Sequence, residues 1–430
     1  MNLTPGQKQI GRRNFMKAIA GTPALAALAG AAATAGPKRG GPVRAALIGA
    51  GGEGKVLLKQ APKNWVDIRA ICDINMNHAT GAADGLAKLG WAKPKAYEDL
   101  KQMLEKEDLE AVIIAVPLFA HADVTVACLE AGKHVLCEKM MAWDVPSCQR
   151  MIDAASKNKR VLEIGYQRMY NPGYQAAYEG IIKKGVLGDI HYVRTYWHRN
   201  TDWRRKVEAT PASLDPSKFG YADLEHLFNW RLYKKHSRGL LAELGSHQLS
   251  VANWVYGATP EAVYASSSLS KDKQDKGREV PDHVFATFEY PGGRTATFTS
   301  VETNEHDEYS EEILGTKGML VFKKESEMYL LPEADAKAVS LEVTPRGANA
   351  IIDASESRAA DAGNRTVKTE GGPDSVFERV VGYTNEIAGF CSAVRMGTPL
   401  RCGPEKALGS AAACIRAFES HDQRQRLAMT

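Results

Sequence analysis

Apolar and polar positions divide the chain into two parts with different periodicities. Between residues 43 and 165, short apolar runs of strand character alternate with stretches of helical period. Ala111–Val116 is apolar at every position, as expected for a strand that is buried on both faces of a sheet. This alternation predicts a doubly wound α/β fold, which binds ligands at the carboxyl ends of its strands. The expected strands are 43–48, 66–72, 111–116, 134–137 and 161–165, and the expected helices are 55–61, 121–131 and 145–157.

The pattern changes beyond Gln167 and favours a sheet with helices. Residues 190–198 alternate apolar and polar or aromatic side chains, and two further runs flank Pro291–Gly293, which predicts a hairpin with a glycine turn. Residues 332–376 are weakly patterned, and we expect them to form a surface excursion. Helices are expected at 240–256, 383–397 and 405–420, and we place the domain boundaries at 42–165 and 166–430.

The first 35 residues have the order of an export signal. The stretch GRRNFMK places Arg12 and Arg13 before an alanine-rich run at 18–36, and small residues favour cleavage after Ala35. The run is too weakly apolar for a transmembrane helix. The paired arginines closely resemble the twin-arginine signal, which bacteria use to export folded proteins, so we expect a periplasmic location. A general secretory signal or a flexible N-terminal arm are the alternatives.

Composition narrows the class of protein. The 430 residues carry a net charge of only +4, without a long Lys/Arg block, so nucleic acid is not an expected partner. The seven cysteines form no CxxC pair, so the sequence indicates neither a zinc site nor a disulfide framework.

A glycine-rich loop follows the first expected strand. Gly49, Gly51 and Gly54 fit the G-x-G-x-x-G pattern, with Gly52 inside it, and a helical stretch follows. In this pattern the first glycine allows a tight turn, the second allows close approach of pyrophosphate, and the third allows helix–strand packing. Asp73 follows the next strand, where its carboxylate would bind the adenosine ribose and repel a 2′-phosphate; a helix N-cap in the loop is the alternative. We therefore expect NAD rather than NADP as the cofactor.

The export signal and the cofactor loop fit together in one account. NAD is not freely available in the periplasm, so a protein that needs it there must fold around it in the cytoplasm and retain it. The twin-arginine route carries folded proteins. Together the two features predict that the protein binds NAD tightly. They also predict that the export machinery is a partner.

Candidate chemistry lies at one strand end and on one helix. Lys139 follows the strand 134–137, either as a solvated charge or as a group that interacts with a reacting hydroxyl. Glu243 and His247 are spaced i,i+4 on one helix face, either as a buried histidine held by a glutamate or as a general base with its partner. A metal site here would need further ligands. The long irregular segment 202–235 is charged and aromatic. We expect its residues Trp230, Arg231 and Tyr233 to line a pocket, and a plain surface loop is the alternative.

These residues together resemble the Gfo/Idh/MocA family of oxidoreductases. The resemblance rests on the glycine loop, Asp73, AVP...H at 115–121 and CEKM at 137–140, and also on the stretches 165–174, 240–254 and 313–322. It implies an N-terminal Rossmann domain and a C-terminal α/β domain with a large, mostly antiparallel open sheet. It also implies a homo-oligomer formed through that sheet.

The resemblance also implies roles for single residues. Lys139 would contact the reacting hydroxyl, and Glu243 and His247 match the family's aspartate–histidine pair. Met140 stands where the family has proline, and a cis peptide bond costs more at methionine. Gln167 would lie at the nicotinamide, Pro117, His121 and Glu138 at the cofactor, and Arg168 at the substrate.

The function that follows is an exported NAD-dependent oxidoreductase acting on a ring hydroxyl of a sugar, glycoside or cyclitol. The first alternative is a redox-neutral glycosidase that oxidises a ring hydroxyl, eliminates the glycosidic group, adds water and reduces the ring again. The second is a non-catalytic sugar-binding protein on a dehydrogenase fold.

Overall fold

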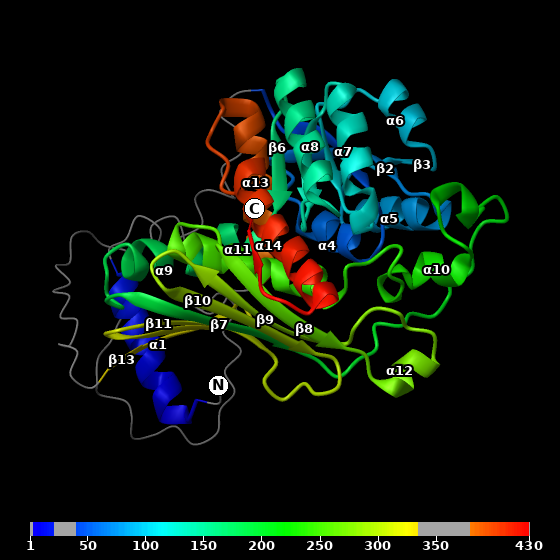
Figure 1. The fold of residues 1–430 in the computed structure, drawn as a ribbon. Helices are drawn as coiled ribbons and strands as arrows, with labels where there is room; N and C mark the ends of the chain where they lie inside the picture. The colour runs from blue at the N-terminus through cyan, green and yellow to red at the C-terminus, as the bar shows by residue number, and fades with distance from the viewer. Residues whose placement is uncertain (1–2, 21–39, 334–378, 430) are drawn as a thin grey trace, which may run out of the picture.

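The computed structural model describes residues 3–20, 40–333 and 379–429, and it contains two sheets with helices packed between and around them (Figure 1). The first sheet is parallel throughout, and its strand order is β3-β2-β1-β4-β5-β6. This is the doubly wound α/β arrangement that the sequence predicts. Its strands are β1 (Val43–Ile48), β2 (Val66–Cys72), β3 (Lys95–Tyr97), β4 (Ala111–Ile114), β5 (His134–Glu138) and β6 (Leu162–Gly165).

Helices cover both faces of this sheet. α4 and α5 share one buried cluster with α13, which returns from the end of the chain, while α7 and α8 pack on the opposite side. The helices are α4 (Gly52–Gln60), α5 (Met76–Lys88), α6 (Leu100–Lys106), α7 (His121–Glu130), α8 (Val145–Asn158) and α13 (Arg379–Met396).

The second sheet is mostly antiparallel, with the order β13-β12-β11-β7-β10-β9-β8-β14, and only β7 and β10 pair in parallel. The hairpin predicted at Pro291–Gly293 joins β9 to β10. Its strands are β7 (Ile190–His198), β8 (Ala262–Ser268), β9 (His283–Tyr290), β10 (Arg294–Val301), β11 (Tyr309–Gly315), β12 (Gly318–Lys323), β13 (Glu327–Pro332) and β14 (Leu427–Ala428).

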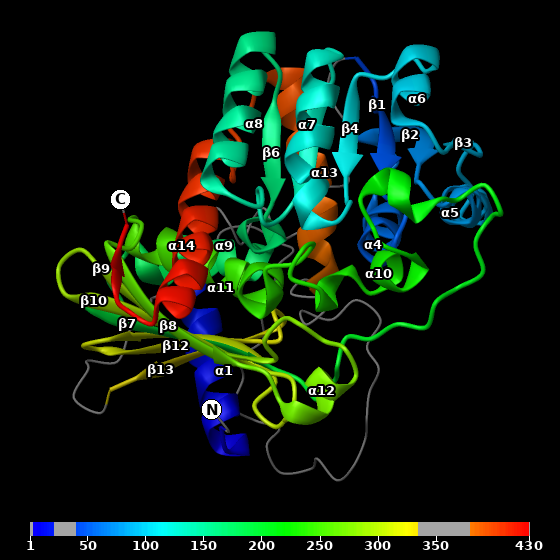
Figure 2. The same ribbon diagram turned by 45° about the vertical axis from the view of Figure 1, so that its right-hand side comes forward.

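Of the helices of the second half, α9, α11 and α14 lie between the two sheets (Figure 2). The helix expected over 240–256 is present, and its first part is a π-helical turn, η6 (Leu241–Gly245), which leads directly into α11. The other helical elements of this half are α9 (Pro172–Ala177), η3 (Tyr178–Ile182), η4 (Pro216–Phe219), α10 (Leu224–Phe228), η5 (Trp230–Leu232), α11 (Ser246–Tyr256), α12 (Lys271–Asp275) and α14 (Pro404–Gln423).

The paired arginines lie in a helix, α1 (Pro5–Ile19), which packs against β13. Phe15, Ala18 and Ile19 are buried, whereas Arg12 and Arg13 are exposed. No helix within the described residues is long and apolar enough to cross a membrane. The rest of the alanine-rich run, the expected cleavage site and nearly all of the excursion at 332–376 lie outside the described residues.

The turn from β1 into α4 requires glycine at two positions. Gly49 has a φ of +92°, and a Cβ atom there would lie 2.6 Å from the carbonyl oxygen of Ala115. A Cβ atom on Gly54 would lie 2.0 Å from the carbonyl oxygen of Gly49. The first turn of α4 therefore packs directly on the end of β1, which is the packing role that the sequence assigns to the third glycine.

A buried ion cluster ties the junction of the two halves to the second sheet. Arg168, in the short helix η2 (Gln167–Tyr170), pairs with Glu311 on β11 and with Glu325, and all three side chains are fully buried. Tyr174 also donates to Glu311, at 2.6 Å. The expectation that Arg168 binds substrate is therefore corrected, because its guanidinium is committed to these carboxylates inside the protein.

The substitution Arg168→Met should lower the free energy of unfolding by about 3–5 kcal/mol, because it leaves buried carboxylates without their cation. Lys183→Met is the control, since it breaks the exposed Lys183–Glu179 pair of 2.8 Å and should cost less than about 1 kcal/mol. Urea unfolding of both variants measures the difference. Equal losses of unfolding free energy in the two variants would show that the buried ion cluster of Arg168 does not stabilise the fold more than an exposed ion pair.

The substitution Gly54→Ala should lower both the melting temperature and the retention of a bound dinucleotide, because the new methyl group would collide with the backbone of Gly49. The matched control is Gly85→Ala in α5, where a Cβ atom meets nothing within 4 Å and alanine favours the helix by up to about 1 kcal/mol. Differential scanning calorimetry and nucleotide content of the purified variants give the two readouts. A Gly54→Ala protein that matches the control in both would contradict the packing argument.

Candidate active site

A cavity of about 1280 Å³ opens at the carboxyl ends of β1, β2, β4 and β5. One wall comes from the glycine loop and the loops after these strands. The other comes from the second half of the chain, through Arg205, Tyr221, Trp230, Arg231 and Glu243. The cavity thus lies where doubly wound sheets bind ligands, and both halves of the chain are needed to enclose it.

The glycine loop forms one end of the cavity and suits a phosphate group. Gly49, Gly51 and Gly52 line it, whereas Gly54 lies behind them against β1. Among the described residues, no atom outside the neighbouring residues of the loop lies within 4 Å of the position that a Cβ atom of Gly51 would take, and no side chain caps α4. The first amides of α4 and the positive end of its dipole are therefore available to an anion such as pyrophosphate.

Asp73 lines the same end, at the carboxyl end of β2. Its carboxylate accepts hydrogen bonds from the backbone N–H of Ala50, at 2.7 Å, and of Asn75, at 2.8 Å. Burial raises the pKa of this carboxyl group, and the two hydrogen bonds act in the opposite direction. The side chain is thus held beside the glycine loop, where the adenosine ribose of a dinucleotide lies in such folds. The residues present fit NAD.

Lys139 and Glu243 meet at the other end of the cavity. The Nζ atom of Lys139, just after β5, donates to the carbonyl oxygen of Glu243 in η6 at 2.8 Å. The Nε atom of Arg231 donates to the Glu243 carboxylate, also at 2.8 Å. All three residues line the cavity, so an ammonium, a carboxylate and a guanidinium converge on one region.

The loops that carry these groups are fixed by His121 and Glu138. The ring nitrogens of His121 face the carbonyl oxygens of Met140 and Val116, each at 2.9 Å, and burial lowers the pKa of the imidazole. Glu138 accepts from the backbone N–H of Lys139 at 3.1 Å. The Lys139–Met140 peptide bond is cis although methionine replaces the family's proline. Pro117, His121 and Glu138 all line the cavity.

Aromatic residues complete the wall. The guanidinium of Arg231 lies over the ring of Trp230, 4.3 Å from its centroid, and both residues line the cavity as expected. Phe119, after β4, and Tyr221, from the second half, contact each other edge to face with ring centroids 5.6 Å apart. Flat apolar faces beside charged donors are a common arrangement in small-molecule sites.

Three other residues expected at the site are not among those that line the cavity. Tyr233 stacks on His226, with ring centroids 4.0 Å apart, and donates to Glu225. Gln167 is buried and donates to the hydroxyl of Tyr383 at 3.3 Å. His247 is 4% exposed and lies near the rings of Tyr166 and Trp197. The pocket role expected for Tyr233 is therefore corrected, because its hydroxyl and ring are engaged outside the cavity.

Sequence reasoning missed Arg205, although it noted the charged stretch around it. Arg205 lines the cavity, and its Nη2 atom lies 3.9 Å from the position that a Cβ atom of Gly52 would take. Within the described residues no group of three or more His, Cys, Asp or Glu side chains could hold a metal ion, and all seven cysteines are buried and unpaired. Besides the charged residues already described, the cavity is also lined by Glu53, Glu98, Asp99, Lys101 and Glu105.

Two family models match the chain. One, described as the NAD-binding Rossmann fold of an oxidoreductase family, matches residues 43–166, and one described as the C-terminal alpha/beta domain of that family matches residues 180–429. Inositol 2-dehydrogenase of Salmonella typhimurium is 38% identical over 149 residues, which are 34% of this chain and 43% of that protein. An uncharacterized oxidoreductase of Rhizobium meliloti, ORF334, is 24% identical over 83% of this chain and 89% of that protein.

Solved structures agree with this fold. The crystal structure of GenD2 from gentamicin A biosynthesis in complex with NAD superimposes with a TM-score of 0.67 at 20% identity, over 92% of this chain and 99% of that one. The glycine loop, Asp73, Lys139 and Glu243 occupy one cavity between the two matched regions. The chain therefore belongs to the Gfo/Idh/MocA family of oxidoreductases, and its first domain is an NAD-binding Rossmann domain.

Proposed function

We propose that this protein oxidises or reduces a ring carbon of a sugar, glycoside or cyclitol, with NAD as the hydride carrier. The observation that carries the proposal is the meeting of Lys139, Glu243 and Arg231 in the NAD-binding cavity. Such a ring presents several hydroxyl groups and an apolar face. The charged groups suit the hydroxyls, and Trp230 and Phe119 suit the face. The inositol dehydrogenase relatives support a polyol ring as the substrate class.

Each residue of the site has a task in this reaction. NAD, when bound, accepts or returns the hydride of the reacting carbon. The Nζ atom of Lys139 is the donor that orients the substrate hydroxyl and stabilises negative charge on its oxygen as the proton leaves. Arg231 and Glu243 fix each other at 2.8 Å and hold the neighbouring hydroxyls in register. His247, one helical turn beyond Glu243 but not among the residues that line the cavity, is our hypothesis for the proton acceptor.

We also propose that the protein is exported by the twin-arginine route. The support is the GRRNFMK pattern and the alanine-rich run after it, together with the exposure of Arg12 and Arg13 on α1. An export system that carries folded proteins would carry this one with its cofactor in place.

Turnover should reveal the substrate class. The purified protein is incubated with a panel of sugars, glycosides and cyclitols while the absorbance of bound NADH is followed. Lasting NADH formation with one class would support net oxidation. Product without lasting NADH would favour a redox-neutral cycle, and binding without either would contradict the proposed enzyme.

The substitution His247→Ala should lower the rate on a proven substrate by about 10²–10⁴-fold while NAD stays bound, because it removes the proton acceptor. A variant that loses thermal stability but keeps near-normal turnover would show that this buried histidine only supports the fold. Glu243→Gln should be milder than His247→Ala.

The substitution Lys139→Ala should lower the rate without emptying the nucleotide site, because the orienting donor is lost. Lys133→Ala is the matched control: Lys133 also donates to a backbone carbonyl, that of Leu109 at 3.0 Å, but does not line the cavity. Single-turnover kinetics and nucleotide content are measured for both. If the two lysine variants lose equal activity, Lys139 has no special role.

Changing both Arg12 and Arg13 to lysine should leave the protein in the cytoplasm, because the export machinery reads the arginine pair. Lys17→Arg serves as the control for a change of basic side chain in the same helix. Immunoblots of periplasmic and cytoplasmic fractions measure the result. An unchanged periplasmic yield of the double variant would disprove the twin-arginine route.

A further inference from the structure

The irregular segment from Arg199 to Pro211 crosses from the second sheet to the Rossmann domain, and we call it the strap. It leaves the end of β7 and reaches the start of α5, as the green loop on the right of Figures 1 and 2 shows. At the end of the strap that is distant from β7, the side chain of Asn77 on α5 donates to the carbonyl of Ala209. The Nε2 atom of His78 lies 3.3 Å from a carboxylate oxygen of Glu208. His78 in turn lies 3.8 Å from Asp73. The strap therefore runs beside the adenosine end of the cavity.

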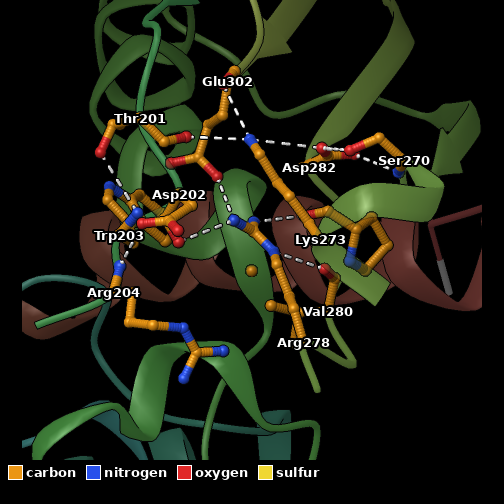
Figure 3. Close-up of polar contacts among 12 residues, drawn as sticks. Thr201, Asp202, Trp203, Arg204, Ser270, Lys273, Arg278, Val280, Asp282 and Glu302 are labelled. Atoms are coloured by element: carbon orange, nitrogen blue, oxygen red, sulfur yellow. Dashed lines mark hydrogen bonds and ion pairs between the residues drawn. The ribbon is translucent and has the colours of Figure 1, made fainter. Parts of the chain in front are cut away.

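The root of the strap is anchored by buried charges (Figure 3). Lys273 donates to the carbonyls of Thr201, at 2.9 Å, and Glu302, at 2.8 Å, and it also pairs with Asp282. Arg278 pairs with Glu302 at 2.5 Å and donates to the carbonyl of Asp202. Removing a partner from such buried pairs is costly, so the root is fixed to the second sheet.

The backbone then turns sharply and delivers two arginines. Trp203 has a φ of +60°, which is uncommon for a residue with a side chain, and Thr201 and Asp202 accept hydrogen bonds from the N–H groups of Trp203 and Arg204. The side chain of Asn229 binds the backbone of Arg205 on both sides. It accepts from the Arg205 N–H at 2.6 Å and donates to the Arg205 carbonyl at 3.0 Å. The position of Arg205 is thus specified by its backbone.

The guanidinium of Arg205 has no assigned task within the protein. Among the described residues, it forms no hydrogen bond and no ion pair, whereas that of Arg204 binds Glu225 and the carbonyl of Lys276. It lines the cavity beside Gly52, at the start of α4. The Arg205 side chain is exposed to solvent in the cavity. Its partial desolvation and the nearby Arg231 lower the pKa of the guanidinium, and an anion bound beside it would favour the charged form.

We propose that Arg205 binds the pyrophosphate of NAD from the side opposite the glycine loop, and that the strap thereby retains the cofactor. The amides of α4 contact the diphosphate from the Rossmann domain, and the planar guanidinium contacts it from the second domain. The dinucleotide is then held by both domains. Release requires the tip of the strap to leave α5, where two hydrogen bonds of 3.3 Å hold it, while the root stays in place.

The test measures release of bound NADH from the full chain, followed by fluorescence after dilution into excess NAD. Arg205→Ala should raise the release rate and the Kd for ADP-ribose by about 10-fold or more, which corresponds to about 1.4 kcal/mol. The release rate and Kd of Arg205→Lys should fall between those of the parent protein and Arg205→Ala, because an ammonium keeps the charge but lacks the planar geometry of a guanidinium. Lys206→Ala is the matched control: the residue is exposed, adjacent and equally charged, and its variant should behave like the parent.

Adenosine carries no phosphate, so its binding shows whether Arg205 acts on the pyrophosphate or on the adenosine end of the cavity. Arg205→Ala should leave adenosine binding unchanged, whereas Asp73→Ala should weaken it. Equal losses for adenosine and ADP-ribose, or equal release rates for Arg205→Ala and Lys206→Ala, would overturn the proposal. The measurements need no substrate, so they stand apart from the ring-oxidation proposal.

Discussion

The hydrogen bond from the Lys139 ammonium to the Glu243 carbonyl joins the two halves of the molecule at the point where chemistry is proposed. Lys139 ends a strand of the parallel sheet, and Glu243 belongs to a π-helical turn that packs on the second sheet. π-helical turns inside helices are frequent at functional sites. Neither half alone forms the cavity, so the relative placement of the domains is itself part of the site.

Most of the Rossmann half was predicted from the sequence, because its signals are local, although the short β3 and the helices α5 and α6 were not. Apolar runs, helical periods and the glycines at 49, 51 and 54 each act within a few residues, and the strands they predict lie within a few residues of the observed bounds. The role of Arg168 could not be predicted from such local signals. Its carboxylate partners, Glu311 and Glu325, are 143 and 157 residues away, so only the folded chain shows that this arginine is occupied.

In the second half of the chain, the sequence predicted individual site residues, and only some of them line the cavity. The segment 202–235 was expected to line a pocket, and Trp230 and Arg231 do line it, but Tyr233 turns toward His226. Irregular segments carry no period that fixes side-chain direction. Arg205 depends on a left-handed residue, Trp203, and on the distant Asn229, neither of which leaves a recognisable pattern in the sequence.

The docking of α1 on β13 has a consequence for the life of the protein after synthesis. β13 is an edge strand, and uncovered edge strands are templates for aggregation. Phe15 and Ile19 are fully buried in α1, and burying such side chains is worth about 1.5–3 kcal/mol each. A chain cut after Ala35 would lose this cover. Under the export proposal, the same helix would be read by the export machinery before cleavage, and it would shield β13 against self-association for as long as it remains attached.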